Sequence, residues 1–107
     1  MEKINYIRHL NGIFEQFSKD QRITVVHRSL YLAIFEIWNR KFFQEVFMIN
    51  RQQVMGLAKI RSRTTYHKHL NELHNFGYLI YFPSHDILKG SKIRMYYFGK
   101  ELDQEMN

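Results

Sequence analysis

The chain has 107 residues, of which 45% are hydrophobic and 16% aromatic, with no cysteine and a net charge of +6. This composition predicts one domain with a sizeable core and excludes a disulfide framework or a thiolate metal site. No run approaches the roughly 18 apolar residues of a membrane span, and the opening MEKINYIRHLNG lacks the apolar stretch of a signal peptide. We therefore expect a soluble, cytoplasmic protein with no membrane partner.

Positive charge is concentrated in the second half of the chain. Residues 51–100 contain nine Lys or Arg and two acids, a net charge of +7, whereas residues 101–107 contain three acids and no base. Basic charge can serve solubility alone. The clustering of basic residues here favours a positively charged surface that binds phosphate groups.

An amphipathic helix is predicted over residues 3–17. Its apolar positions recur at helical spacing on one side, and they are Tyr6, Ile7, Leu10, Ile13, Phe14 and Phe17. The polar residues 18–22 break the pattern. The apolar stripe can pack within its own subunit, against the following helix, or against a second copy of the chain, and the sequence supports both equally.

A longer helix is predicted over residues 23–41 as the central support of the fold. Its core-facing stripe consists of Val26, Leu30, Ala33, Ile34, Ile37 and Trp38. The next segment, residues 42–49, ends in the apolar run VFMI, which is rich in residues that favour strands. We expect a short first strand there.

A short helix is predicted from Arg51 to Ala58. Its start carries Asn50 as N-cap, Gln53 three residues later, and Ile49 placed to pack on Val54 as a hydrophobic staple. The residues after Ala58 lead directly into a second N-cap. A tight turn between two helices is therefore expected.

The second helix is predicted over residues 63–76, between the N-cap Ser62 and Gly77 in the left-handed C-cap position. One stripe is apolar, with Tyr66, Leu70 and Leu73. The opposite face bears Thr64, Lys68, Asn71 and Asn75, with Arg63, His67 and His74 on one flank. Such a face is often only a solvated surface. When such a helix follows a short capped helix and a tight turn, its polar face is typical of a helix that enters the DNA major groove.

Two further strands are predicted, over residues 78–82 and 93–98. The run YLIYF alternates and is stopped by Pro83, and residues 83–92 form the connection. Together with the strand before Asn50, these segments would form a small antiparallel sheet.

The stretch Ser62-Arg63-Thr64-Thr65-Tyr66-His67-Lys68-His69-Leu70, with Leu73 and Gly77–Ile80, resembles the recognition helix and first wing strand of bacterial winged helix-turn-helix proteins. The likeness extends to small regulators of this fold, some of them carried on mobile elements. It implies an α+β fold in which a three-helix core carries a small antiparallel β wing, here with an extra N-terminal amphipathic helix. Residues 1–107 would form one domain, with the helix in 1–18, the core in 23–98 and a tail in 99–107.

The resemblance and the charge pattern predict a protein that binds double-stranded DNA, either a transcriptional regulator or an accessory factor of a mobile element. The second helix would contact base edges and phosphates, and the wing, residues 83–94, would contact the backbone or minor groove. The predicted contact residues are Arg61, Ser62, Arg63, Thr64, Thr65, His67, Lys68, Asn71, Lys89, Lys92 and Arg94. Ile87 and Leu88 could instead fold the loop onto the body and leave its lysines solvated.

No catalytic, metal or cofactor site is predicted. His67 and His69 stand two apart on a helix and face different ways, with no carboxylate at ligand spacing beside them. Residues 90–92, Gly-Ser-Lys, lack the spacing and setting of a phosphate-binding loop. No nucleophile elbow or paired carboxylates accompany the Ser, His and Asp residues. We therefore expect no enzyme.

An assembly module that works through the aromatic N-terminal helix is the alternative. Such a module does not need a net charge of +7 over residues 51–100, so the charge favours DNA. One recognition helix reads only a few base pairs, and useful specificity usually needs two copies. We therefore expect a homodimer, formed through the exposed apolar stripe of Ile7, Leu10, Phe14 and Phe17.

Overall fold

A computed structural model describes residues 4–84 and 90–99 of the chain. Within these residues lie four helices and a three-stranded antiparallel sheet, which confirms the predicted α+β class. They form two compact units, residues 4–23 with 96–99 and residues 24–84 with 90–95. A single domain over the whole chain stays a prediction.

The first unit is built on helix α1, Tyr6–Lys19. The sequence predicts a break after residue 17, yet the helix continues through Ser18 and Lys19. The Ser18 hydroxyl donates to the Phe14 carbonyl at 2.9 Å, and the Lys19 ammonium donates to the Glu15 carboxylate at 3.0 Å. Because both polar side chains find partners one turn back, they extend the helix instead of ending it.

The third strand was predicted over residues 93–98. The predicted end was wrong, because the strand stops at Met95. The residues after it belong to the first unit. The Phe98 amide donates to Nδ1 of His9 at 3.1 Å, and the His9 ring stacks on Tyr97 with the ring centroids 5.9 Å apart. Burial lowers the pKa of His9 to about 4, so at neutral pH its ring is uncharged and can accept this hydrogen bond.

Helix α2, Val25–Arg40, is the centre of the second unit. Thr24 and His27 form a capping box, in which Nδ1 of His27 accepts from the Thr24 amide at 2.9 Å. This cap makes the helix begin two residues later than the predicted residue 23. The apolar stripe is confirmed, apart from the half-buried Val26. Besides His27, the buried side chains are Leu30, Tyr31, Ala33, Ile34, Phe35, Ile37 and Trp38.

The sheet contains β1 (Val46–Ile49), β2 (Leu79–Phe82) and β3 (Ser91–Met95) in the order β1-β3-β2. Strand β3 begins two residues before its predicted start, because Ser91 pairs with Ile49 and Lys92 pairs with Phe82. One face of the sheet is buried, and its side chains are Phe47, Ile49, Leu79, Ile93 and Met95.

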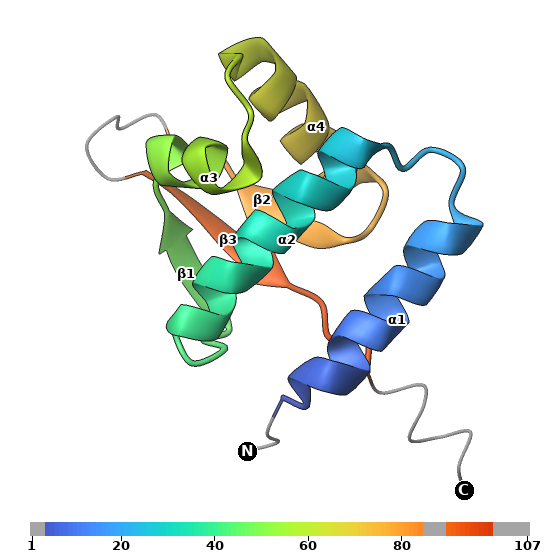
Figure 1. Ribbon diagram of the computed structural model, residues 1–107. Coiled ribbons are helices and arrows are strands. Elements are labelled where there is room, and N and C mark those ends of the chain that lie inside the picture. Colours follow the sequence, from blue (N-terminus) through green and yellow to red (C-terminus); the bar gives the residue numbers. More distant parts are fainter. Residues whose placement is uncertain (1–3, 85–89, 100–107) are drawn as a thin grey trace, which may run out of the picture. The chain divides into compact units, whose positions relative to one another are not determined.

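The two helices predicted around the tight turn are confirmed. Helix α3 spans Arg51–Ala58 and helix α4 spans Arg63–Asn75, one residue shorter than predicted. Phe76 caps α4, and Gly77 follows with a φ of 88°, as its left-handed position requires. Helix α2 packs against α3, α4 and β1, while α4 also packs on β2 (Figure 1).

Candidate nucleic-acid interface

The turn between α3 and α4 is held by its own backbone and by α2. Lys59 is left-handed with a φ of 62°, and the Ile60 amide donates to the Met55 carbonyl at 3.0 Å. From α2, the Ser29 hydroxyl donates to the Ala58 carbonyl at 2.5 Å. These contacts fix the direction in which α4 leaves the turn.

The face of α4 opposite the core carries the predicted polar side chains. The apolar face is buried through Tyr66, Leu70 and Leu73. The contact residues predicted at the start and on the outer face are exposed, and they are Arg61, Ser62, Arg63, Thr64, His67, Lys68 and Asn71. Thr65 is only half-buried on the flank, where its carbonyl accepts from Nδ1 of His69 at 2.7 Å. Thr65 is therefore less accessible than the other predicted contact residues of this helix.

Glu72 is the one acidic residue of α4, and it engages a residue of α2. Its Oε1 lies 3.0 Å from Nε2 of His27. Because Nδ1 of His27 accepts from the Thr24 amide, Nε2 carries the proton and donates to the carboxylate. The exposed face of α4 therefore presents Arg63 and Lys68 with no carboxylate from their own helix between them.

A groove of about 560 Å³ lies between the starts of α3 and α4 and the hairpin of β2 and β3. Arg51, Arg63 and His67 line it. The amide groups at the start of a helix carry partial positive charge, so two helix starts and two guanidinium groups favour an anion here. Arg51 was not among the predicted contact residues, although its place directly after the Asn50 cap was predicted to be a helix start.

The hairpin cations lie on the outer face of the sheet. Lys92 and Arg94 flank the buried Ile93 on β3, and alternate residues of a strand point to opposite faces. Arg94 pairs with the Glu45 carboxylate at 2.9 Å, so its charge is partly compensated. Lys89, which was also predicted to contact DNA, lies outside the described residues, and so does the segment 87–88.

Lys92 lines a second hollow, of about 800 Å³, on that outer face. The hollow is largely apolar, with Met48 and Phe82 beside the lysine. It shares Ser84 and Gly90 with the groove at the helix starts. Lys92 therefore lies close to the groove, at the base of the hairpin loop.

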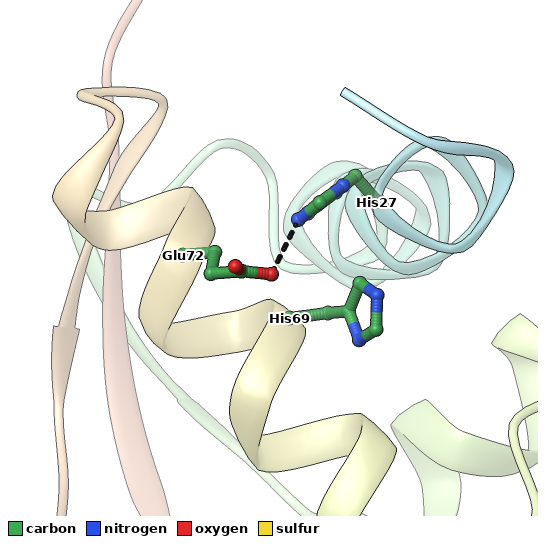
Figure 2. Close-up of side chains that lie close together, drawn as sticks. All are labelled: His27, His69 and Glu72. Atoms are coloured by element: carbon green, nitrogen blue, oxygen red, sulfur yellow. Dashed lines mark hydrogen bonds and ion pairs between the residues drawn. The ribbon is translucent and has the colours of Figure 1, made fainter. Parts of the chain in front are cut away.

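Three side chains of α2 and α4 form a cluster that sequence analysis missed. His27, His69 and Glu72 offer ligand atoms that all lie within 4.8 Å of one another (Figure 2). The expectation that no carboxylate stands at ligand spacing beside these histidines was wrong for His69, because Glu72 follows one turn later. His67 differs from it, since it is exposed and its Nδ1 bonds the Arg63 carbonyl at 3.0 Å.

Within the described part of the chain, none of the helices has the length and apolar character needed to cross a membrane. Comparisons with protein-family models, curated proteins and solved structures found no match to this chain. The functional proposal therefore rests on the geometry and charge described above.

Proposed function

We propose that this protein binds double-stranded DNA as a winged helix-turn-helix protein, with α4 as its recognition helix. The observation that carries the proposal is the exposed face of α4, where Arg63, Lys68 and Asn71 are accessible and the helix's one carboxylate, Glu72, is engaged by His27. Cations without a neighbouring acid attract phosphate, and an amide side chain can read a base.

The dimensions and the side chains of α4 suit the major groove. A helix about 10–12 Å wide fits a groove about 12 Å wide. Arg63 and Lys68 would donate to O6 and N7 of guanine, and Asn71 would pair with N6 and N7 of adenine. Thr64 is also exposed and would bond either kind of base. His67 also lines the groove at the helix starts, but its Nδ1 already donates to the Arg63 carbonyl, so it would need a second proton, on Nε2, to donate to a phosphate.

The groove at the starts of α3 and α4 would hold the DNA backbone. Arg51 and Arg63 supply two guanidinium groups beside helix amides, and this combination suits a phosphate oxygen. Lys92 would extend the contact along the hairpin as a wing. Arg94 has a smaller part in this proposal, because Glu45 already pairs with it.

A sequence-reading protein of this kind would serve in the cytoplasm as a transcriptional regulator or as an accessory factor of a mobile element. The first test is a binding selection from random DNA duplexes. The enriched sequence and a scrambled copy are then compared by fluorescence anisotropy at one fixed salt concentration. We expect the enriched duplex to bind more tightly.

Replacing Asn71 with alanine should weaken binding of the enriched duplex by about 1–3 kcal/mol and leave the scrambled duplex nearly unchanged, because a bidentate base contact is lost. Arg51→Ala should weaken both duplexes by the same factor, since a phosphate contact carries no sequence information. Anisotropy titrations of both variants against both duplexes measure this difference.

Both variants should remain folded, because Asn71 is exposed and the Arg51 side chain is only half-buried. Circular dichroism provides this control. Equal losses on the two duplexes would remove Asn71 from the base-reading set. A selection with no enrichment, together with no binding of random duplexes, would reject the proposal in favour of an assembly module.

The proposal includes a homodimer formed through α1. Ile7 and Phe14 of the predicted stripe are 59% and 38% exposed. The prediction of exposure was wrong for its other two members, since Phe17 is buried and Leu10 is half-buried. Two copies joined through the exposed part would place two recognition helices on one DNA site. In sedimentation at tens of micromolar we expect a dimer, and the double variant Ile7→Glu/Phe14→Glu should be a monomer. Val25→Glu, at an apolar residue of α2 that is 81% exposed, is the matched control and should stay dimeric. A wild-type monomer would contradict the dimer.

A further inference from the structure

We propose that His27, His69 and Glu72 form a binding site for a divalent transition-metal ion, with Zn²⁺ as the best match. Two imidazoles and one carboxylate, from α2 and α4, bring ligand atoms within 4.8 Å of one another. Figure 2 shows the three side chains gathered between the two helices. Two His and one Glu is a ligand set that zinc uses when a fourth position is left for water. The inference does not depend on DNA binding.

The tautomer of His69 suits a metal ligand. Its Nδ1 lies 2.7 Å from the Thr65 carbonyl, and a carbonyl only accepts, so Nδ1 carries the proton and Nε2 carries the lone pair. Histidines that bind metals commonly donate their second N–H to a backbone carbonyl in this way, which fixes the tautomer and makes the other nitrogen more basic. The helix itself supplies this support, from the preceding turn.

His27 and Glu72 already meet, with Nε2 and Oε1 at 3.0 Å. Metal binding requires the proton of His27 Nε2 to leave, so that the nitrogen can offer its lone pair. The ring can carry its proton on Nδ1 instead, where Oγ1 of Thr24 stands 3.0 Å away and can accept it. This change of tautomer gives up the hydrogen bond that Nδ1 accepts from the Thr24 amide. The ion would thus take the place of the proton between imidazole and carboxylate, and the ring stays neutral.

Binding of a zinc ion would draw the three ligand atoms closer together. Ligand atoms around tetrahedral zinc stand about 3.4 Å apart, given bonds of about 2.0–2.1 Å. The His69 ring would therefore have to approach the other two ligands by roughly 1 Å. His27 is 2% exposed, but the Glu72 side chain is 33% exposed, so an ion and its water would enter on the carboxylate side.

A purely structural role would account for less of this arrangement. A hydrogen-bonded link between α2 and α4 needs only His27 and Glu72. The third group, His69, lies against the His27 ring with the ring centroids 4.6 Å apart, and its Nδ1 is held by its own helix. Two histidines in tilted ring contact beside one carboxylate make a set of three ligand groups, and a catalytic-type zinc site uses three protein ligands.

The test uses the untagged full-length protein after treatment with a chelator. Calorimetric titration should show one Zn²⁺ per chain, and Co²⁺ should give the visible absorption of a four-coordinate ion. His69→Gln and Glu72→Gln should each lower zinc affinity by more than the roughly 10- to 100-fold typical of outer-shell changes. The matched control is His67→Gln, which removes a histidine with the same type of bond to the preceding turn and should leave zinc affinity unchanged.

NMR spectra of the wild-type protein test the site even if a variant unfolds. Among the six histidines of the chain, the imidazole signals of His27 and His69 should shift when Zn²⁺ is added. Zinc should also raise the thermal midpoint of the wild type, because the ion binds the folded state. The site is overturned if no saturable binding occurs at micromolar zinc, if both ligand substitutions leave the affinity unchanged, or if other histidines shift instead.

Discussion

Raising the salt concentration from about 50 mM to about 200 mM is expected to weaken binding of duplex DNA roughly 1,000-fold. Each phosphate contact from Lys or Arg releases counterions, so the logarithm of the affinity falls linearly with the logarithm of the salt concentration. About five to seven contacts give a slope of about −5 to −6. Among the described residues, the accessible cations of this half of the chain, apart from the paired Arg94, are Arg51, Lys59, Arg61, Arg63, Lys68 and Lys92. Fluorescence anisotropy on a labelled duplex measures the slope.

Two arginines provide the matched comparison for this slope. Arg63→Gln removes a cation from the start of α4 and should make the slope shallower by about 1. Arg40→Gln removes an exposed cation from the end of α2, where Glu36 pairs with it, and should leave the slope unchanged. The absence of any binding at low salt would reject the DNA proposal outright. A salt-independent affinity would reject the proposed phosphate contacts.

Gly90→Ala is expected to destabilise the protein by about 2–5 kcal/mol. Gly90 has a φ of 71°, in the left-handed region, which costs a residue with a Cβ about 1–2 kcal/mol. Its Cβ would also lie 2.6 Å from the Ile49 carbonyl oxygen, a backbone atom that cannot move without displacing β1. Overpacking of this kind typically costs about 1–3 kcal/mol. Urea denaturation measures the change in the free energy of unfolding.

Gly77→Ala is the matched control, because it isolates the backbone cost. Gly77 also has a positive φ, 88°, but a Cβ there would have nothing within 4 Å. We expect this variant to lose only about 1–2 kcal/mol of the free energy of unfolding. The slope of that free energy against urea concentration should equal that of the wild type. Equal losses for the two variants would show that the close approach of Gly90 to β1 does not constrain the base of the hairpin loop.

The helices around the turn were predictable because their signals are local. Asn50 accepts from the Gln53 amide at 3.0 Å, and Ser62 accepts from the Thr65 amide at 3.2 Å. Each cap joins residues three apart, so no other part of the chain is needed to place the start of the helix. Periodicity likewise assigned the buried and exposed faces of α4, and with them most of the candidate contact surface.

The strands and the chain after them were less predictable, because partners distant in sequence decide where a strand begins and ends. The start of β3 depends on its pairing with β1 and β2, which places Ser91 opposite Ile49. Its end depends on Phe98, whose amide bonds His9 from 89 residues away. Neither partner lies within the run of strand-favouring residues near the end of the chain. The run alone therefore predicted a strand over residues 93–98.

The sequence by itself therefore determined the starts of α3 and α4, the polar face of α4 and the basic charge around it, since each of these is a property of neighbouring residues. Only the tertiary structure decided which charges are compensated and which side chains meet. It pairs Arg94 with Glu45, and it brings His27 to Glu72 across 45 residues. Such contacts arise when packing of the apolar faces brings separate helices and strands together, and no local pattern encodes them.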